Sequence, residues 1–224
     1  MPGSLLKKYN PPLRSFTQRC IDTLTFPLRA LTLFETDKWG LSSLASERFD
    51  YVARQTKGYC LDIGCGKHNR FIVEYLQGNG KGIDVFCYEG LTKDNIVNDM
   101  THLPFKDASF DSVSIIASIN HIPRTQRNAE LKEAYRCLRQ GGVIIITMGN
   151  PLAEILVHKL NFFYTKLLPH YVDMDSQRGM HQDEDYYLTD SEINQRLSDI
   201  EFTHIKKKYF LTQWGLNHLF TATK

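Results

Sequence analysis

The segment Tyr59–Gly66 limits the fold of this chain more than any other feature of the sequence. It reads YCLDIGCG, an apolar run that ends in a Gly-x-Gly turn. Glycine has no side chain and accepts unusual dihedral angles, so such a turn lets the backbone approach a ligand closely. Asp84 follows Gly66 by 18 positions and ends a second apolar run. This spacing predicts a β-α-β unit in which Asp84 accepts hydrogen bonds from both ribose hydroxyls of an adenosine-type cofactor.

Two residues distinguish between the adenosine cofactors. A dinucleotide-binding turn has a third glycine at position 69, where this chain has Asn69. Asp62 lies inside the motif, two residues before Gly64. Its carboxylate would repel a pyrophosphate, whereas it suits a ligand that carries ammonium and sulfonium groups. These charges indicate S-adenosyl-L-methionine.

With these features the chain resembles the class I S-adenosylmethionine-dependent methyltransferases, in particular the small-molecule enzymes of the type 11 group with the motif LDIGCG. The resemblance extends from Tyr59 to Pro151. It rests on four blocks in the family's order, which are LDIGCG at 61–66, GIDVF at 82–86, NDMTHLPFKDASFDSV at 98–113 and EAYRCLRQGGVIIITMGNP at 133–151. The resemblance implies that Asp84 binds the ribose, that Asp99 lies near the adenine amino group and that the backbone of Met100 reaches the ring.

The expected cofactor-binding residues lie in these blocks and just after the next apolar run. They are Asp62, Gly64, Cys65, Gly66, Arg70, Asp84, Val85, Asp99, Met100 and Ser118. His68 and Arg70 are alternatives for contact with the methionine carboxylate. The chain departs from the family at His68, since the family continues its motif to a third glycine there.

Apolar runs of four to eight residues alternate with helical patterns between Tyr59 and Met148. Such alternation is typical of a buried parallel sheet with helices on both faces. Thr189 and Glu192 form a capping box that starts a further helix, and two β-like runs follow it. The pattern and the resemblance together predict an α/β, doubly wound Rossmann-like sheet of seven strands, with a C-terminal antiparallel hairpin and a helical cap.

Four parts are expected along the chain. They are an N-terminal helical cap (1–57), the S-adenosylmethionine-binding core (58–151), a helical insertion with a substrate loop (152–188), and a C-terminal helix with antiparallel strands that complete the core (189–224). Apolar residues recur at helical spacing over 152–168. This helix is expected to pack over the active site, with a dimer face or a membrane surface as alternatives.

Two histidines are the candidate catalytic residues. His121 follows the apolar run SVSIIASI, and side chains after such a strand lie at the carboxyl edge of the sheet, where ligands bind. It can act as a general base, because a histidine with an ordinary pKa is mostly neutral at pH 7, or it can line the cofactor pocket. His181 lies in the loop RGMHQDEDYYLT and either contacts the substrate or is solvated.

Composition limits the remaining classes. The net charge is +2 over 224 residues, and no basic stripe with interleaved aromatic residues points to a nucleic-acid partner. The five cysteines are odd in number and lack CxxC spacing, which argues against a disulfide framework and against a zinc site. No apolar window reaches the length of a membrane span. We expect a cytoplasmic protein without a bound metal or membrane insertion, either monomeric or a homodimer.

These observations predict a methyltransferase that acts on a small metabolite at oxygen or nitrogen. One alternative is a protein that binds adenosylmethionine without catalysis. Another is an NAD-dependent oxidoreductase, which Asn69, Asp62 and the C-terminal hairpin disfavour.

Overall fold

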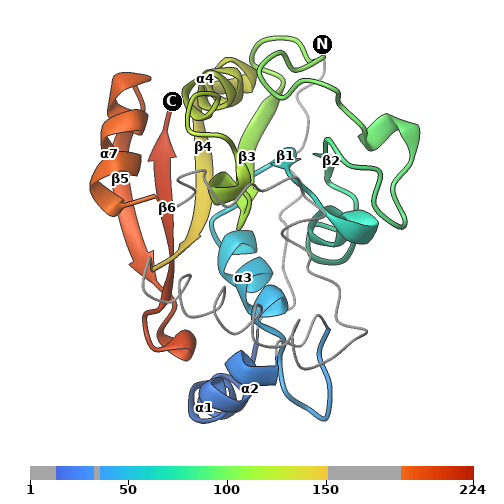
Figure 1. Cartoon of the computed structure of the whole chain (residues 1–224), viewed down its shortest axis with the longest axis vertical. Helices are drawn as coiled ribbons and strands as arrows, with labels where there is room; N and C mark the ends of the chain where they lie inside the picture. Colours follow the sequence, from blue (N-terminus) through green and yellow to red (C-terminus); the bar gives the residue numbers. More distant parts are fainter. Residues whose placement is uncertain (1–13, 33–35, 151–187) are drawn as a thin grey trace.

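The computed structural model describes residues 14–32, 36–150 and 188–224. In this part of the chain, six strands form one sheet in the order β2-β1-β3-β4-β6-β5 (Figure 1). The strands are β1 (Cys60–Ile63), β2 (Gly80–Ile83), β3 (Phe110–Ile116), β4 (Leu138–Gly149), β5 (Thr203–Tyr209) and β6 (Asn217–Thr223). β1 to β4 run parallel, whereas β6 is antiparallel to both β4 and β5. The predicted α/β class is confirmed.

The sheet has six strands where seven were expected. The segment after β2 contributes a single parallel bridge between Asp84 and Ile96 at the place of the missing strand. The chain then turns at Asp99, whose carboxylate accepts a hydrogen bond from the backbone N–H of Thr101 (2.8 Å). An aspartate that bonds the backbone two residues later favours a turn over an extended strand. The described residues therefore contain no full seventh strand.

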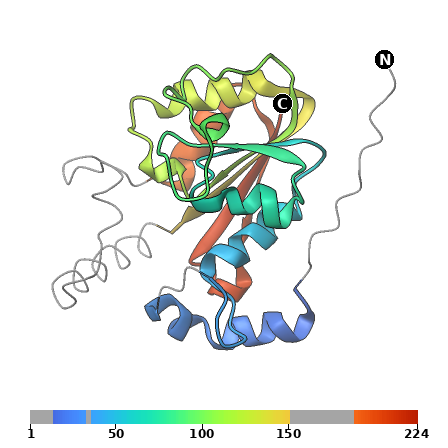
Figure 2. The same ribbon diagram turned by 90° about the vertical axis from the view of Figure 1, so that its right-hand side faces the viewer.

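Helices cover both faces of the sheet (Figures 1 and 2). One face carries α3 (Leu44–Ala53) and a single π-helical turn, Phe71–Tyr75, and the other carries α4 (Arg127–Cys137) and α7 (Asp190–Asp199). α7 begins at the predicted cap, because the Thr189 hydroxyl accepts from the Glu192 N–H (3.2 Å). Two further helices, α1 (Phe16–Leu24) and α2 (Phe26–Thr32), precede α3, and one-turn 3₁₀ helices lie at Lys67–Asn69, Lys93–Asn95, Ile119–His121 and Leu211–Gln213.

Alternating side chains of the central strands fill the two halves of the core. In β1, Leu61 and Ile63 pack with the α4 and α7 residues, whereas Cys60 packs with α3 and the π-helical turn. In β4, Ile144 and Ile145 point in opposite directions in the same way. Successive side chains of a strand face opposite sides, so a strand buried on both faces is mostly apolar.

The N-terminal helices lie near the carboxyl ends of the parallel strands. In Figure 1 the β6 arrow points toward the top of the view, so the parallel strands, which run opposite to β6, end toward the bottom, where α1 and α2 lie in both views. Trp214, after β5, joins them: its indole N–H donates to the carbonyl of Thr23 (2.9 Å), and its ring lies 5.6 Å from that of Phe26. The helices therefore flank the edge where open α/β sheets bind ligands.

A buried ion pair connects these N-terminal elements. The Arg29 guanidinium contacts the Glu47 carboxylate at 3.0 Å, and neither side chain is more than 1% exposed. Arg29 also donates to the carbonyl of Ser42 (2.8 Å), and Gln213 donates to Glu47 (2.7 Å). The pair thus joins α2, α3 and the turn that follows β5.

The helix expected at 152–168 and the loop with His181 lie outside the described residues. Within the described ranges, no helix is both long and apolar enough to cross a membrane.

Replacing Arg29 with methionine should lower the free energy of unfolding by about 3–5 kcal/mol, because the Glu47 charge would stay buried without its counterion. Urea titration measures this loss. The double variant Arg29→Met/Glu47→Gln should regain part of the loss, since no buried charge remains. Lys132→Met, at an exposed position of α4, is the control and should change the free energy little. Equal losses for Arg29→Met and the control would contradict the assignment.

Candidate functional site

The carboxylate of Asp84 joins the turns that follow β1 and β2. Its Oδ2 accepts from the backbone N–H of Gly66, and its Oδ1 accepts from that of Phe86, both at 3.0 Å. The side chain is 95% buried, at the carboxyl edge of the sheet. An ionised carboxylate offers about four acceptor positions, so each oxygen keeps room for one further donor.

The two glycines of the first turn have different reasons to be glycine. Gly64 (φ +76°) lies against Ser118, since a Cβ at Gly64 would come within 2.8 Å of the Ser118 Oγ. That hydroxyl donates to the carbonyl of Ile63 (3.1 Å) and so holds the segment after β3 against the β1 turn. Gly66 (φ +63°) is different, because the space around its absent Cβ is open to a distance of 4 Å. A ligand can therefore approach the backbone closely at Gly66.

The loop keeps a left-handed backbone where the resembling family has its third glycine. His68 has φ +59°, and Asn69 has φ +48°. The His68 N–H donates to the carbonyl of Glu89 (2.8 Å), which fixes this conformation. Histidine and asparagine are among the residues that adopt positive φ more often than most. The departure at His68 therefore changes the side chain and leaves the glycine-like backbone in place.

Asp62 is a buried acid in β1, only 1% exposed. The hydroxyl of Ser114, its register partner on β3, donates to Asp62 Oδ1 at 2.7 Å. Burial raises the pKa of Asp62 to about 7; the Ser114 hydrogen bond opposes this rise, and the charge of Asp84 adds to it. A carboxylate that is costly to ionise without a counterion favours a cationic ligand group beside it.

A strained turn places His121 at the end of β3. Ala117 has φ +51°, and its N–H donates to the Thr147 Oγ1 on β4 (2.8 Å). The following one-turn helix, Ile119–His121, begins after Ser118, whose carbonyl accepts from the N–H of His121 (2.9 Å). His121 is half-buried. Strained residues of this kind cluster at functional sites, where the surrounding structure holds them in place.

Asp99 and Met100 lie on the turn that replaces the seventh strand. The Asp99 side chain is 56% exposed and lies 3.0 Å from the His102 Nδ1. Hydrogen bonds from Thr101, followed by the one from His102, lower its pKa. Met100 is buried. Asp99 is thus ionised and partly accessible, as an acceptor for an amino group requires.

The other expected cofactor residues have the following positions. The Arg70 guanidinium donates to Glu74 (3.1 Å) and lies 5.6 Å from the centre of the Phe49 ring. Cys65 is buried, and burial, with the charges of Asp62 and Asp84, raises its pKa. Val85 is 44% exposed beside Asp84. Arg70 is thus bound to Glu74 and lies near Phe49. Its contact with a methionine carboxylate stays a prediction.

Three polar residues near this edge were missed by the sequence analysis. They are Ser114, Thr147 and Glu130, all buried. Ser114 and Thr147 are hydroxyl residues inside apolar strands, a sequence signal that could have identified them. Burial raises the pKa of Glu130 to about 7, and the negative charge of Asp99 adds to that rise. Glu130 lies in a helix, where a glutamate is an ordinary residue and gives no such signal. Its proximity to Asp99 arises only in the fold.

Comparison with known proteins finds a family model that matches part of the chain. A family model described as a methyltransferase domain matches residues 61–146. The ubiquinone/menaquinone biosynthesis C-methyltransferase UbiE of Geotalea daltonii is 38% identical over 68 residues, which are 30% of this chain and 28% of the relative. The enzyme of the same name from Neisseria meningitidis serogroup C is 32% identical over 88 residues, 39% of this chain and 35% of the relative. The chain thus spans well under half of the length of these curated relatives.

A crystal structure of similar fold is that of an S-adenosylmethionine-dependent methyltransferase from Thermotoga maritima, with a TM-score of 0.56 and 16% identity, over 92% of this chain and 97% of that one. The matched family model and the similar fold indicate S-adenosylmethionine as the cofactor. Residues 61–146 thus match the model of a methyltransferase domain, in a chain with the fold of the class I S-adenosylmethionine-dependent methyltransferases.

Proposed function

We propose that this chain transfers a methyl group from S-adenosylmethionine to a small-molecule acceptor. The observation that supports this most is the arrangement of Asp84 and Gly66. A buried carboxylate with two free acceptor positions lies beside a backbone that a ligand can approach. The two hydroxyls of a ribose match the two free positions, because each hydroxyl supplies one donor.

The charges of the site match the rest of the cofactor. Asp62 is buried on the same edge and costly to ionise alone, so a ligand ammonium beside it would lower its pKa. Asp99 is ionised and exposed enough to accept from an adenine amino group. The proposed cofactor residues are the ten that the sequence predicted, with Asp84, Asp62 and Gly66 best supported.

Catalysis would rest chiefly on orientation. S-adenosylmethionine supplies an electrophilic methyl group on a sulfonium, so the chain must hold an acceptor in line with it. Orientation of this kind can lower a barrier by up to roughly 7–11 kcal/mol. His121 lies after β3 at this edge and is the proposed general base for an acceptor that must lose a proton.

The acceptor is proposed to be a small metabolite methylated at oxygen or nitrogen. The names of the two curated relatives describe C-methyltransferases, which adds carbon as a third candidate atom. A base is useful in each case where the acceptor carries an acidic hydroxyl. A reducing cytoplasm remains the proposed location, and all five cysteines are free thiols.

Two measurements test the proposal. Titration calorimetry should show saturable binding of S-adenosylmethionine and of its demethylated product, and no binding of NAD. Transfer of a radiolabelled methyl group should then be screened against pools of phenols, quinols, amines and carboxylic acids. Binding of the cofactor without transfer to any pool would favour a non-catalytic protein, and binding of NAD alone would refute the proposal.

Asp84→Asn should weaken the binding of S-adenosylmethionine by about 1.5–3 kcal/mol, because charge-assisted hydrogen bonds are lost. Calorimetry measures the affinity, and urea unfolding verifies that the variant is folded. Asp94→Asn, an exposed change nearby, is the matched control. Wild-type affinity in a folded Asp84→Asn protein would remove Asp84 from the site.

The affinity for S-adenosylmethionine should fall by roughly tenfold per unit as the pH drops below about 7, because Asp62 then loses its charge. The same raised pKa stabilises the unliganded protein at low pH, and this contribution is lost as the pH rises from about 4 to about 7. Calorimetry over this range measures the affinity. Asp62→Asn should flatten the affinity profile, and an unchanged slope would show that another group titrates.

His121→Asn should reduce turnover of a hydroxyl acceptor by roughly 100-fold to 10,000-fold if His121 is the base. Its cofactor affinity should change little, and the defect should shrink as the pH rises and the acceptor ionises by itself. Turnover against pH, beside calorimetric cofactor binding, tests both parts. Parallel losses of affinity and rate would instead identify His121 as a pocket residue, and wild-type turnover would exclude it from the mechanism.

A further inference from the structure

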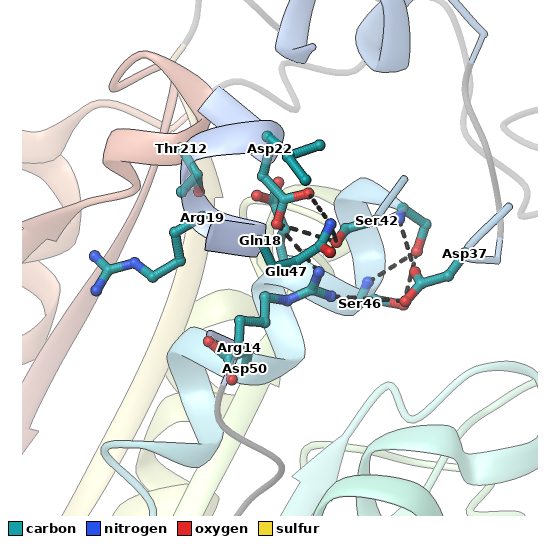
Figure 3. Close-up of polar contacts among 12 residues, drawn as sticks. Arg14, Gln18, Arg19, Asp22, Asp37, Ser42, Ser46, Glu47, Asp50 and Thr212 are labelled. Carbon is teal, nitrogen blue, oxygen red and sulfur yellow. Dashed lines mark hydrogen bonds and ion pairs between the residues drawn. The ribbon is translucent and has the colours of Figure 1, made fainter. Parts of the chain in front are cut away.

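A polar cavity lies between the N-terminal helices and the end of β5. Its volume is about 100 Å³, and its charged lining includes Arg14, Arg19, Glu47, Asp50, Arg54 and Lys208. None of these residues belongs to the proposed cofactor site. Figure 3 shows several of them with the polar network of α1 and α3, in which the Asp22 carboxylate accepts from Gln18 (3.0 Å) and Ser42 (3.0 Å).

Two carboxylates of this cavity each have one oxygen without a partner. Glu47 and Asp50 lie one turn apart on α3 and are 99% and 96% buried. Glu47 Oε2 accepts from Arg29 (3.0 Å), and Asp50 Oδ2 accepts from Arg54 (3.0 Å). Glu47 Oε1 and Asp50 Oδ1 are also buried, yet they accept no hydrogen bond from any described residue. Buried polar atoms are nearly always hydrogen-bonded, so these two oxygens call for a donor.

The cavity also has cationic groups whose donors are not all used. Arg14 pairs through its terminal nitrogens with Asp22 (3.2 Å) and Asp37 (3.9 Å), but its Nε is buried and has no hydrogen-bond partner among the described residues. The side chains of Arg19 and Lys208 form no ion pair within the described ranges. Figure 3 shows Arg19 directed away from the network that holds Arg14. An anionic group would satisfy these donors.

We propose that this cavity binds a small zwitterion with neighbouring ammonium and carboxylate groups, as in a free amino acid. The ammonium donates to Glu47 and Asp50, and the carboxylate accepts from Arg14 and pairs with Arg19 and Lys208. A simple anion would leave the two buried oxygens without donors, and a simple amine would leave Arg14 Nε without an acceptor. The proposal does not depend on methyl transfer, because these residues lie outside the cofactor site.

The test uses the full chain without S-adenosylmethionine. A thermal-shift screen of the standard amino acids identifies the best binder, and calorimetry then compares it with the matching amine, which lacks the carboxylate, and the matching carboxylic acid, which lacks the ammonium. We expect saturable binding of one zwitterion per chain and at least about tenfold weaker binding of either half, equal to about 1.4 kcal/mol.

Two variants separate the two ends of the ligand. Asp50→Asn should weaken binding of the amino acid and leave binding of the carboxylic acid unchanged. Arg19→Met, at an exposed position that does not burden folding, should weaken binding of the amino acid and leave binding of the amine unchanged. Lys206→Met removes an exposed charge elsewhere on β5 and should have no effect.

Three results would overturn the proposal. The first is the absence of saturable binding by any amino acid, which would mean that ordered water alone fills the cavity. The second is equal binding of the amino acid and the carboxylic acid, which would identify a simple anion site. The third is an Arg19→Met protein that binds the amino acid as tightly as the wild type does. Arg19 is exposed, so this variant leaves the buried network intact.

Discussion

The carboxylate of Asp84 is the interaction on which the candidate site depends. The turns after β1 and β2 come from neighbouring parallel strands, and each turn has a backbone N–H directed at this carboxylate. A neutral side chain at this position would leave one of these donors without an equivalent acceptor. Because the same oxygens retain free acceptor positions, a single group both shapes the site and offers it to a ligand.

The βα half of the fold was predictable because its signals are local. The Gly-x-Gly turn, the position of Asp84 and the Thr189 cap all depend on residues close in sequence, and the structure places a strand end, a buried carboxylate and a helix start there. The spacing of apolar runs likewise indicated β3 and β4. Local patterns of this kind survive folding because burial and backbone geometry act on a few neighbouring residues.

The remainder depends on contacts between distant segments. The expected seventh strand is reduced to one bridge because the Asp99 carboxylate accepts a hydrogen bond from the Thr101 N–H and so forms a turn. Apolar periodicity does not predict this hydrogen bond. The partnership of Asp62 with Ser114 requires the register of two strands, because these residues are 52 positions apart in sequence. The polar network of α1, α3 and the turn after β5 likewise cannot be predicted from the sequence, since its partners meet only in the folded protein.

The position of β6 has a consequence for how the sheet is completed. β6 lies between β4 and β5, so residues 217–223 fill an interior position although they are the last strand in sequence. During synthesis β1 to β4 emerge first, and β4 keeps an unpaired edge until these late residues arrive. Pairings across such long sequence separations form slowly, and open strand edges invite association with other chains. The protein should thus pass through a stage in which its parallel half is present and its most vulnerable edge is exposed.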